Sequence, residues 1–170
     1  MKKKNNVIIR YATLADLARI AKIEIENHLK DSDTPLDRML NDLFLNEYKK
    51  RWRKKLLEGI KTLIISAQRK SVGFITFSLH GSEAEIHNIY IMPVARRQYF
   101  GKSLCLHAIN KIKKARMRSV KVWLVTGRTQ IIKFYETLGF SSTSMIRTDE
   151  ISPDIILLER QYILSLKSTL

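Results

Sequence analysis

Short apolar runs separated by turn residues occupy the middle of the chain, a pattern typical of strands joined by tight turns. Residues 62–67 and 72–79 are rich in β-branched and aromatic side chains, and the four polar residues between them predict a hairpin. Residues 80–82 (His-Gly-Ser) then turn the chain into a third apolar segment over residues 83–91. The pattern therefore predicts a three-stranded antiparallel meander.

Apolar side chains recur at helical spacing on both sides of this meander. A capping-box-like start at residues 13–16 opens a helix through about residue 28, and the Thr34-Pro35 pair predicts the start of the next helix. Between residues 36 and 59 the spacing fits one bent helix or two successive helices. The other predicted elements are a strand at 7–11, a helix at 101–116, a strand at 120–125, a short helix within 127–140, and paired strands at 142–146 and 155–160. Together these elements indicate a mixed α/β protein of the α+β class.

A length of 170 residues with 45% hydrophobic content fits one soluble globular domain spanning residues 1–170. No apolar run is long enough to cross a membrane, and the basic start of the chain is not followed by the apolar segment of a secretion signal. The single cysteine, Cys105, permits no disulfide within the chain, and its place on an apolar helix face predicts a core residue. We therefore expect a cytoplasmic protein without a membrane partner.

Charge is the unusual feature of the composition, because 31 Lys and Arg face 16 Asp and Glu, a net charge of +15. Such a field attracts polyanions, which include RNA, the ribosome, a membrane surface and a multiply phosphorylated cofactor. Trp52 lies among six Lys and Arg residues, where it is either a base-stacking group or a core anchor on a helix with a charged outer face. The helical spacing favours the core anchor. The four histidines and Cys105 show no metal-ligand spacing, so no metal site is predicted.

A basic turn joins the strand that ends at residue 91 to the helix that begins near Gly101. The first N–H groups of a helix have no partner within it and carry the positive end of its dipole, so they bind phosphate readily. Arg96, Arg97 and Lys102 add positive charge around the same turn. The turn is either the site of a phosphate-bearing cofactor or an ordinary solvated connection.

The sequence of this turn resembles the GNAT superfamily of acetyl-CoA-dependent N-acetyltransferases. In that signature a strand ends in an aromatic-aliphatic pair, a proline follows two residues on, and an R-x-x-G-x-G segment forms the pyrophosphate loop. Residues 90–101 here read YIMPVARRQYFG, in the same order and spacing. Tyr99 stands where the family has its first glycine.

A second segment also resembles the family, which has an Asn, then a small residue, then a Tyr and a Gly-Phe pair. Tyr135 and the pair Gly139-Phe140 match. Arg128 replaces the Asn and Ile131 the small residue, so the side-chain amide usually placed near the pantetheine is missing.

The resemblance implies a mixed, mostly antiparallel twisted sheet flanked by helices, with its two central strands parted so that acetyl-CoA lies between them. These strands correspond to residues 86–91 and 120–125, within a cofactor-binding core at 62–140 that follows a strand and helices at 7–58 and precedes C-terminal strands at 142–160. It assigns acetyl-CoA as acetyl donor in a direct transfer to a primary amine. The residues implied for acetyl-CoA binding are Ile89, Ile91, Arg96, Arg97, Gln98, Tyr99, Phe100, Gly101, Lys102, Ser103 and Arg128.

Direct transfer requires a neutral amine, a polarised carbonyl and a protonated leaving thiolate. Glu85 matches the family's strand carboxylate and is the candidate base, with His87 on the same strand face to help carry the proton; a solvated strand-end residue is the alternative. Tyr135 matches the thiolate acid, or else it is a core aromatic. A backbone N–H near Ile91 would polarise the carbonyl.

Two functions remain open from the sequence. The first is an N-acetyltransferase acting on a small-molecule, peptide or protein amine, for which the positive charge favours an amine on an anionic carrier such as a ribosomal protein terminus or aminoacyl-tRNA. The second is a degenerate GNAT fold that binds RNA or the ribosome, suggested by the charge and by Tyr99 and Arg128 at altered positions. A homodimer is expected from the resemblance alone.

Overall fold

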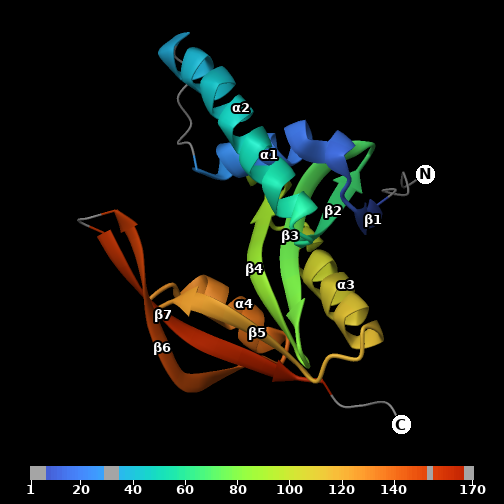
Figure 1. The fold of residues 1–170 in the computed structure, drawn as a ribbon, viewed down its shortest axis with the longest axis vertical. Coiled ribbons are helices and arrows are strands. Elements are labelled where there is room, and N and C mark those ends of the chain that lie inside the picture. Colours follow the sequence, from blue (N-terminus) through green and yellow to red (C-terminus); the bar gives the residue numbers. More distant parts are fainter. Residues whose placement is uncertain (1–6, 29–34, 153–154, 167–170) are drawn as a thin grey trace. The chain divides into compact units, whose positions relative to one another are not determined.

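A computed structural model describes residues 7–28, 35–152 and 155–166. Its strands are β1 (Val7–Tyr11), β2 (Lys61–Ala67), β3 (Lys70–His80), β4 (Glu83–Ile91), β5 (Ser119–Val125), β6 (Ser141–Ser152) and β7 (Ile155–Ser165). Its helices are α1 (Leu17–His28), α2 (Pro35–Leu57), α3 (Phe100–Lys114) and α4 (Thr129–Thr137), with short 3-10 turns η1 (Leu14–Asp16) and η2 (Pro93–Ala95) (Figure 1).

The strands form one sheet in the order β1-β2-β3-β4-β5-β7-β6. Pairing is antiparallel for β1 with β2, β2 with β3, β5 with β7 and β6 with β7, whereas β4 and β5 are parallel. Because β4 and β5 are parallel, the chain between them crosses over through α3. This mixed, mostly antiparallel sheet with flanking helices confirms the predicted α+β class.

Most predicted elements lie within a few residues of the observed ones, and the differences have simple causes. Residues 35–57 form a single helix, which decides between the two alternatives for this segment, whereas the predicted cap at Thr34 lies outside the described residues. Strands β6 and β7 are longer than expected. Residues 147–150 of β6 are polar and exposed, so no alternation of apolar side chains marked them as a strand.

The chain falls into two compact units, which are described separately. One contains residues 1–77 and 88–108, and the other residues 78–87 and 109–170. Strands β3 and β4 and helix α3 run from one unit into the other. A single domain over residues 1–170 therefore stays a prediction. No described helix is long and apolar enough to cross a membrane.

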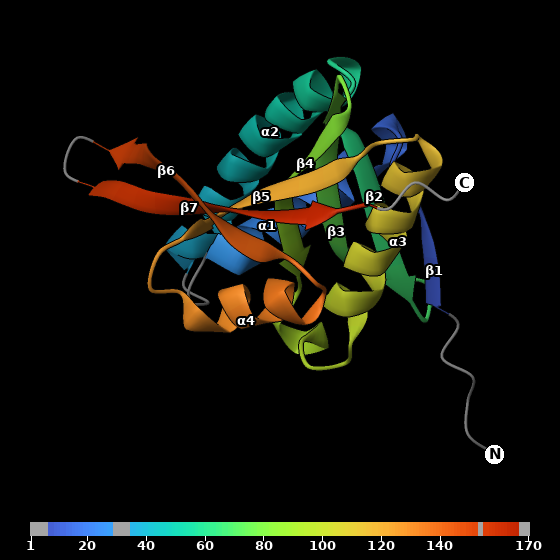
Figure 2. The ribbon, with the colours of Figure 1, turned by 90° about the horizontal axis from the view of Figure 1, so that it is seen from below.

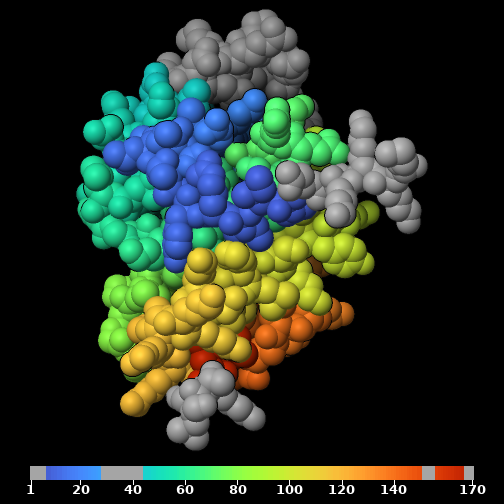
Figure 3. All heavy atoms as spheres, turned by 90° about the vertical axis from the view of Figure 1, so that its right-hand side faces the viewer, coloured from blue at the N-terminus to red at the C-terminus, as the bar shows by residue number. Residues whose placement is uncertain are grey.

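In the first unit, α1 and α2 pack on each other and on the sheet around Trp52. The Trp52 side chain is fully buried, its ring meets Phe74 edge to face at 5.1 Å, and its indole N–H donates to Glu24 at 2.6 Å. The core-anchor interpretation of Trp52 is thus correct, and the ring is not available for stacking on a base. Figure 3 shows the blue surface of β1, η1 and α1 adjoining the teal surface of α2.

In the second unit, α4 lies alongside the pair of strands β6 and β7 (Figure 2). A Cβ atom at Gly139, just after α4, would lie 3.3 Å from Leu164 of β7, which places the end of this helix against the strand. Arg147 of β6 stacks over the Trp123 ring at 4.4 Å and pairs with Glu159 of β7 at 2.7 Å. The first contact packs the end of α4 against β7, and the contacts of Arg147 join β6 to β5 and β7.

Candidate active site

The turn between β4 and α3 is fixed at both ends by backbone hydrogen bonds. The Met92 N–H donates to the Val72 carbonyl of β3 at 2.8 Å, and the N–H of Ser103 donates to the Tyr99 carbonyl at 3.0 Å. Pro93 begins η2, where its fixed φ suits a helical turn and its missing N–H is not needed. The turn is therefore a defined structure and not a loose connection.

Six consecutive N–H groups, those of residues 97–102, lie between these anchors. Within the described part of the chain, the N–H groups of residues 97–102 donate to no backbone or side-chain acceptor. Arg97 and Tyr99 have φ values of 63° and 61°, in the left-handed region that residues with a Cβ rarely adopt. Successive free N–H groups in such a turn, followed by a helix N-terminus, form an anion-binding concavity.

The three predicted cations differ in what they contact. Arg96 extends its guanidinium to the side-chain oxygen of Asn27 at 2.8 Å and to the Ile91 carbonyl at 3.4 Å. Arg97 and Lys102 are exposed and have no ion-pair partner among the described residues. Two cations at the turn are thus available to an anion, while the third links the turn to α1.

The backbone N–H of Ile91 points to the edge of β4 that faces away from β3. Consecutive N–H groups of a strand point to opposite edges, and that of Met92 points to β3, so that of Ile91 points the other way. The ladder with β5 pairs Glu83–Ile86 with Ser119–Val122, and Ile91 lies beyond its last pair. The side chains of Ile89 and Ile91 pack against the start of α3. A Cβ on Gly101 would lie 4.0 Å from Ile89 and 3.7 Å from Ile91.

Glu85 belongs to a chain of polar contacts in the second unit. Its carboxylate lies 3.5 Å from Nδ1 of His87 and 3.7 Å from Nζ of Lys121, and Nε2 of His87 is 2.8 Å from the Ser78 hydroxyl. The predicted juxtaposition of Glu85 and His87 on one face of β4 is therefore present. Lys121 also lies 3.8 Å from Glu83, so two carboxylates share one ammonium group.

The two remaining predicted residues also lie in the second unit. Arg128 is exposed at the residue before α4. Tyr135 is buried within α4, its ring edge to face with Phe134 and Phe140 at 5.2 Å each. This packing accounts for a large aromatic residue at position 135, and the role of its hydroxyl stays a prediction.

Several residues at the site were missed from the sequence. Gly73 allows β3 to pass close to β4, because a Cβ there would lie 2.5 Å from Ile91 Cδ1 and 2.6 Å from the Tyr90 carbonyl oxygen. A glycine inside an apolar strand is the signal that could have indicated it. Lys121 is likewise a lone cation in an otherwise apolar strand. The contact of Asn27 with Arg96 had no sequence signal.

Comparison with known proteins agrees with this geometry. Residues 20–140 match the acetyltransferase (GNAT) family. An uncharacterized N-acetyltransferase of Bacillus subtilis strain 168, YuaI, is 27% identical over 138 residues, which cover 76% of this chain and 78% of YuaI.

Solved structures share the fold. The ribosomal-protein-S18-alanine N-acetyltransferase of Escherichia coli superposes with a TM-score of 0.71 at 19% identity, covering 96% of this chain and 98% of that one. The putative acetyltransferase yncA of Salmonella typhimurium, solved with its cofactor acetyl-CoA, gives a TM-score of 0.67 at 20% identity over 96% of this chain and 95% of that one.

The family match covers more than half of the chain and includes both motifs from which the resemblance was recognised. It confirms, at the level of the family, the prediction of an N-acetyltransferase with acetyl-CoA as donor. The chain belongs to the GNAT family of acetyltransferases.

Proposed function

We propose that the protein transfers the acetyl group of acetyl-CoA directly to a primary amine, with the diphosphate of the cofactor bound by the turn at residues 97–102. The observation that carries this proposal is the row of six N–H groups in that turn that have no acceptor among the described residues. They offer hydrogen bonds to phosphate oxygens without rearrangement, and Arg97 and Lys102 supply unpaired charge beside them. When bound, acetyl-CoA supplies the activated acetyl group.

The Ile91 N–H is proposed to polarise the thioester carbonyl. It points away from β3 and lies past the end of the β4–β5 ladder, so it is free to donate to a developing oxyanion. The side chains of Ile89 and Ile91 pack against the start of α3, which fixes this stretch of backbone. Among the described residues, Arg96 donates to the Ile91 carbonyl, which further fixes the orientation of that peptide.

Glu85 is proposed as the base that takes a proton from the attacking ammonium group, directly or through water. Lys121 and His87 both contact its carboxylate, and the Ser78 hydroxyl forms a hydrogen bond with the His87 ring. Tyr135 is proposed to protonate the departing thiolate, as the matched position in the family implies. The acetyl carbon exchanges its bond to sulfur for one to nitrogen. Nitrogen loses two protons between ammonium and amide: Glu85 takes the first and passes it to solvent, and the second balances the proton that sulfur gains from Tyr135.

For the acceptor we propose an amine on an anionic carrier. The net charge of +15 draws such a carrier toward the enzyme and disfavours free polyamines. The E. coli structural relative is named as a ribosomal-protein-S18-alanine N-acetyltransferase, so the fold includes an enzyme for an amine on a ribosomal protein. The cytoplasmic location expected from the sequence likewise remains a proposal. Assembly as a homodimer remains a proposal from the resemblance.

The test of cofactor binding compares CoA with pantetheine, which lacks the diphosphate. Isothermal titration calorimetry should show CoA binding in the micromolar range and pantetheine at least tenfold weaker. Equal affinities would refute the assignment of the turn at 97–102.

The test of the base uses two neighbouring carboxylates that share Lys121. Glu85→Gln should lower kcat about 100-fold or more while leaving acetyl-CoA affinity unchanged. Glu83→Gln, two residues earlier on the same strand face, should stay within about threefold of wild type. Equal losses in the two variants would show that only the ion pair with Lys121 matters.

A further inference from the structure

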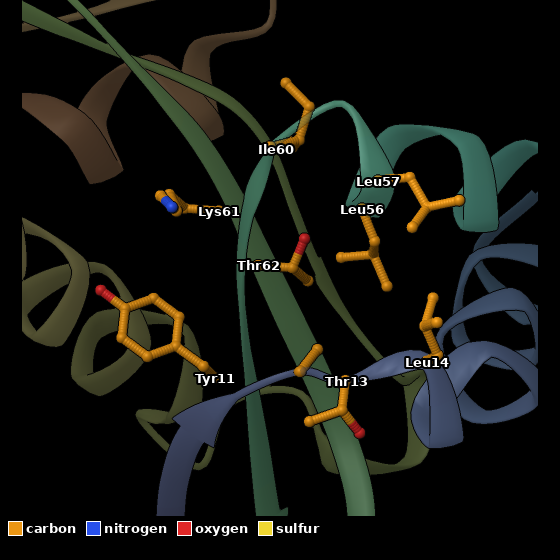
Figure 4. Close-up of a pocket in the computed structure, with 10 residues that line it drawn as sticks. Tyr11, Thr13, Leu14, Leu56, Leu57, Ile60, Lys61 and Thr62 are labelled. Carbon is orange, nitrogen blue, oxygen red and sulfur yellow. The ribbon is translucent and has the colours of Figure 1, made fainter.

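A cavity of about 490 Å³ lies in the first unit, where β1 ends and the chain turns into η1 (Figure 4). Its walls come from residues 11–14 and from the stretch between residues 56 and 62. Lys61 and Thr62 are consecutive in β2, so their side chains leave opposite faces of the strand, and the Thr62 hydroxyl is buried. No ligand in this cavity could contact both polar groups. A more complete set of polar groups lies in the second unit.

One face of the sheet in the second unit carries polar side chains on four adjacent strands, β4, β5, β7 and β6. Glu85 of β4 is the ladder partner of Lys121 in β5, so both side chains lie on this face. Trp123 follows two residues later on the same face, and it is the first residue of β5 beyond the last ladder pair with β4. Gln161 of β7 is the ladder partner of Trp123. The candidate base therefore shares a face of the sheet with Trp123.

Arg147 of β6 extends over this face. Its guanidinium stacks on the Trp123 ring at 4.4 Å, and its Nε donates to the Glu159 carboxylate at 2.7 Å. A guanidinium has five N–H donors, of which Nε supplies one. The two Nη groups of Arg147 have no acceptor among the described residues, and 46% of its side chain is exposed. The stacked cation is thus held in place while its remaining donors are available to a ligand.

Solvent reaches the face beneath this guanidinium. The indole N–H of Trp123 has no acceptor in the described part of the chain, and it is not among the buried side-chain atoms that lack a partner there. Trp52 differs, because its indole N–H donates to Glu24 within the core. The side chains of Lys121 and Glu85 are also partly exposed, at 27% and 17%. A ligand can therefore approach Trp123 and Glu85 from the same side of the sheet.

We propose that Arg147 selects the acceptor by binding a carboxylate that lies close to the amine to be acetylated. This inference rests on the proposed function, in which Glu85 receives a proton from that amine. The free Nη edge of a guanidinium matches a carboxylate and binds it through two parallel hydrogen bonds. Trp123 and the Nε contact with Glu159 fix the plane of the guanidinium, so little side-chain freedom is lost on binding.

The spacing of these residues indicates where the carboxylate lies in the acceptor. Trp123 is a diagonal neighbour of Glu85, at roughly 7–8 Å between Cα atoms, and Arg147 lies over the Trp123 ring. An extended peptide advances about 3.3–3.6 Å per residue. An acidic side chain at the second or third position can thus meet Arg147 while the N-terminal amine lies at Glu85. The acceptor is accordingly a peptide or protein N-terminus with an acidic residue at one of these positions.

The experiment compares two peptide amides of eight residues that differ only in where two glutamates stand. The near peptide has them at the second and third positions, the far peptide has them at the seventh and eighth, and all other residues are serine. Net charge and long-range attraction are therefore equal. With saturating acetyl-CoA and 300 mM salt, kcat/KM for the near peptide should be about tenfold higher than for the far peptide. Calorimetry on CoA-saturated protein should show the same preference without turnover.

Variants then assign the preference to Arg147. Arg147→Gln should reduce the near-to-far ratio to less than about twofold. Arg53→Gln removes an equal charge from an exposed position of α2 and should keep the wild-type ratio. Glu159→Gln leaves the guanidinium in place and removes a competing carboxylate, so the ratio should be retained or increased. If the Arg147–Glu159 pair were only structural, Arg147→Gln and Glu159→Gln would change the ratio alike.

Three results overturn the inference: equal kcat/KM for the two peptides in the wild type, an unchanged ratio in Arg147→Gln, or equal losses of the ratio in Arg147→Gln and Glu159→Gln. Absence of acetyl transfer to both peptides also overturns it, and calorimetry with CoA then separates two cases. Retained CoA binding would reject this acceptor while leaving the proposed acetyl transfer in place. Absence of CoA binding would reject the proposed function as well.

Discussion

Tyr99 combines a backbone donor of the turn with a left-handed conformation. Its φ of 61° costs a residue with a Cβ about 1 kcal/mol relative to glycine. The residue is 79% exposed, so its side chain makes few contacts that would offset this cost. The replacement of the family glycine therefore keeps the N–H in place at some strain. The contribution of position 99 to anion binding lies in its backbone.

Two substitutions at position 99 separate the backbone from the side chain. Tyr99→Gly relieves the strain and keeps the N–H, so CoA affinity should be equal to or up to threefold higher than that of wild type. Tyr99→Pro has no N–H and cannot adopt φ near 60°, so affinity should fall tenfold or more. Calorimetry with CoA checks both, and a large loss in Tyr99→Gly would mean that the ring itself contacts the cofactor.

Asp16 is a second residue whose surroundings predict a measurable effect. Its carboxylate is 1% exposed and accepts hydrogen bonds from the Arg10 guanidinium at 2.7 and 2.8 Å, from Arg19 at 3.1 Å and from the Thr13 N–H at 2.9 Å. Hydrogen bonds from Arg10 hold the pKa of Asp16 well below its usual range, against the opposing effect of burial. The folded state therefore favours the ionised carboxylate.

The sign of the pH dependence follows from this lowered pKa. A carboxyl group with a depressed pKa in the folded state stabilises the protein above its unfolded pKa of about 4, and this stabilisation is lost as pH falls below that value. Asp16→Asn should lower the free energy of unfolding at pH 7 by about 3 kcal/mol and flatten its decline between pH 5 and pH 3. Urea unfolding across this range measures both effects. The exposed carboxylate Asp149 provides the control, since Asp149→Asn should leave the pH profile unchanged; a profile unaltered in Asp16→Asn contradicts the prediction.

At the scale of elements, the approach of β3 to β4 fixes the strand that carries the candidate site. Gly73 faces Ile65 in the β2–β3 ladder, and any side chain at position 73 would run into Ile91 and the Tyr90 carbonyl. The neighbouring Gly101, by contrast, has room for a methyl group. A side chain at position 73 would therefore clash with Ile91, whereas a methyl group at position 101 would make an ordinary contact with the same isoleucine.

This difference makes a matched pair of glycine-to-alanine variants. Gly73→Ala should destabilise the protein by about 2–3 kcal/mol and weaken CoA binding, because the end of β4 must shift. Gly101→Ala should leave the free energy of unfolding unchanged or raise it by up to about 1 kcal/mol, as expected for alanine in a helix. Urea denaturation compares them, and similar stabilities would contradict the close packing of β3 on β4.

The elements also show how far the sequence predicts this fold. Strands and helices with regular apolar spacing were predicted, and Trp52 and Cys105 were correctly placed in the core because each lies on an apolar helix face. Burial raises the pKa of the Cys105 thiol to about 12, as expected for a packed and unreactive cysteine. The polar half of β6 was missed because its stability comes from pairing with β7, which leaves no local pattern.

The site shows the same division between local and long-range information. The motif at residues 90–101 predicted the turn and the helix start that follow β4, since helix-terminus chemistry is local, and the binding of an anion there stays a prediction. The contact of Arg96 with Asn27 joins residues 69 positions apart and depends on how α1 packs. The left-handed backbone of Tyr99 was also unpredictable from residue type, because tyrosine rarely adopts it.

At the scale of the whole molecule, the net charge of +15 should act on the acceptor through long-range attraction. Electrostatic steering raises association rates by roughly 10- to 1,000-fold and declines as salt shortens the Debye length, from about 30 Å at 0.01 M to about 8 Å at 0.15 M. Acetylation of peptides with an N-terminal amine followed by acidic or by neutral residues can be compared at saturating acetyl-CoA, so that salt effects on cofactor binding do not contribute.

For the acidic peptide, kcat/KM should fall about tenfold between 20 and 300 mM salt while kcat stays constant. For the neutral peptide the change should be less than twofold. A thiol-release assay gives both parameters, with matched ionic strength from two different salts to exclude specific ion effects. An equal dependence in the two peptides would show that the charge serves another purpose, and salt-sensitive RNA binding by a protein without affinity for CoA would instead support a role as a nucleic-acid-binding member of the fold.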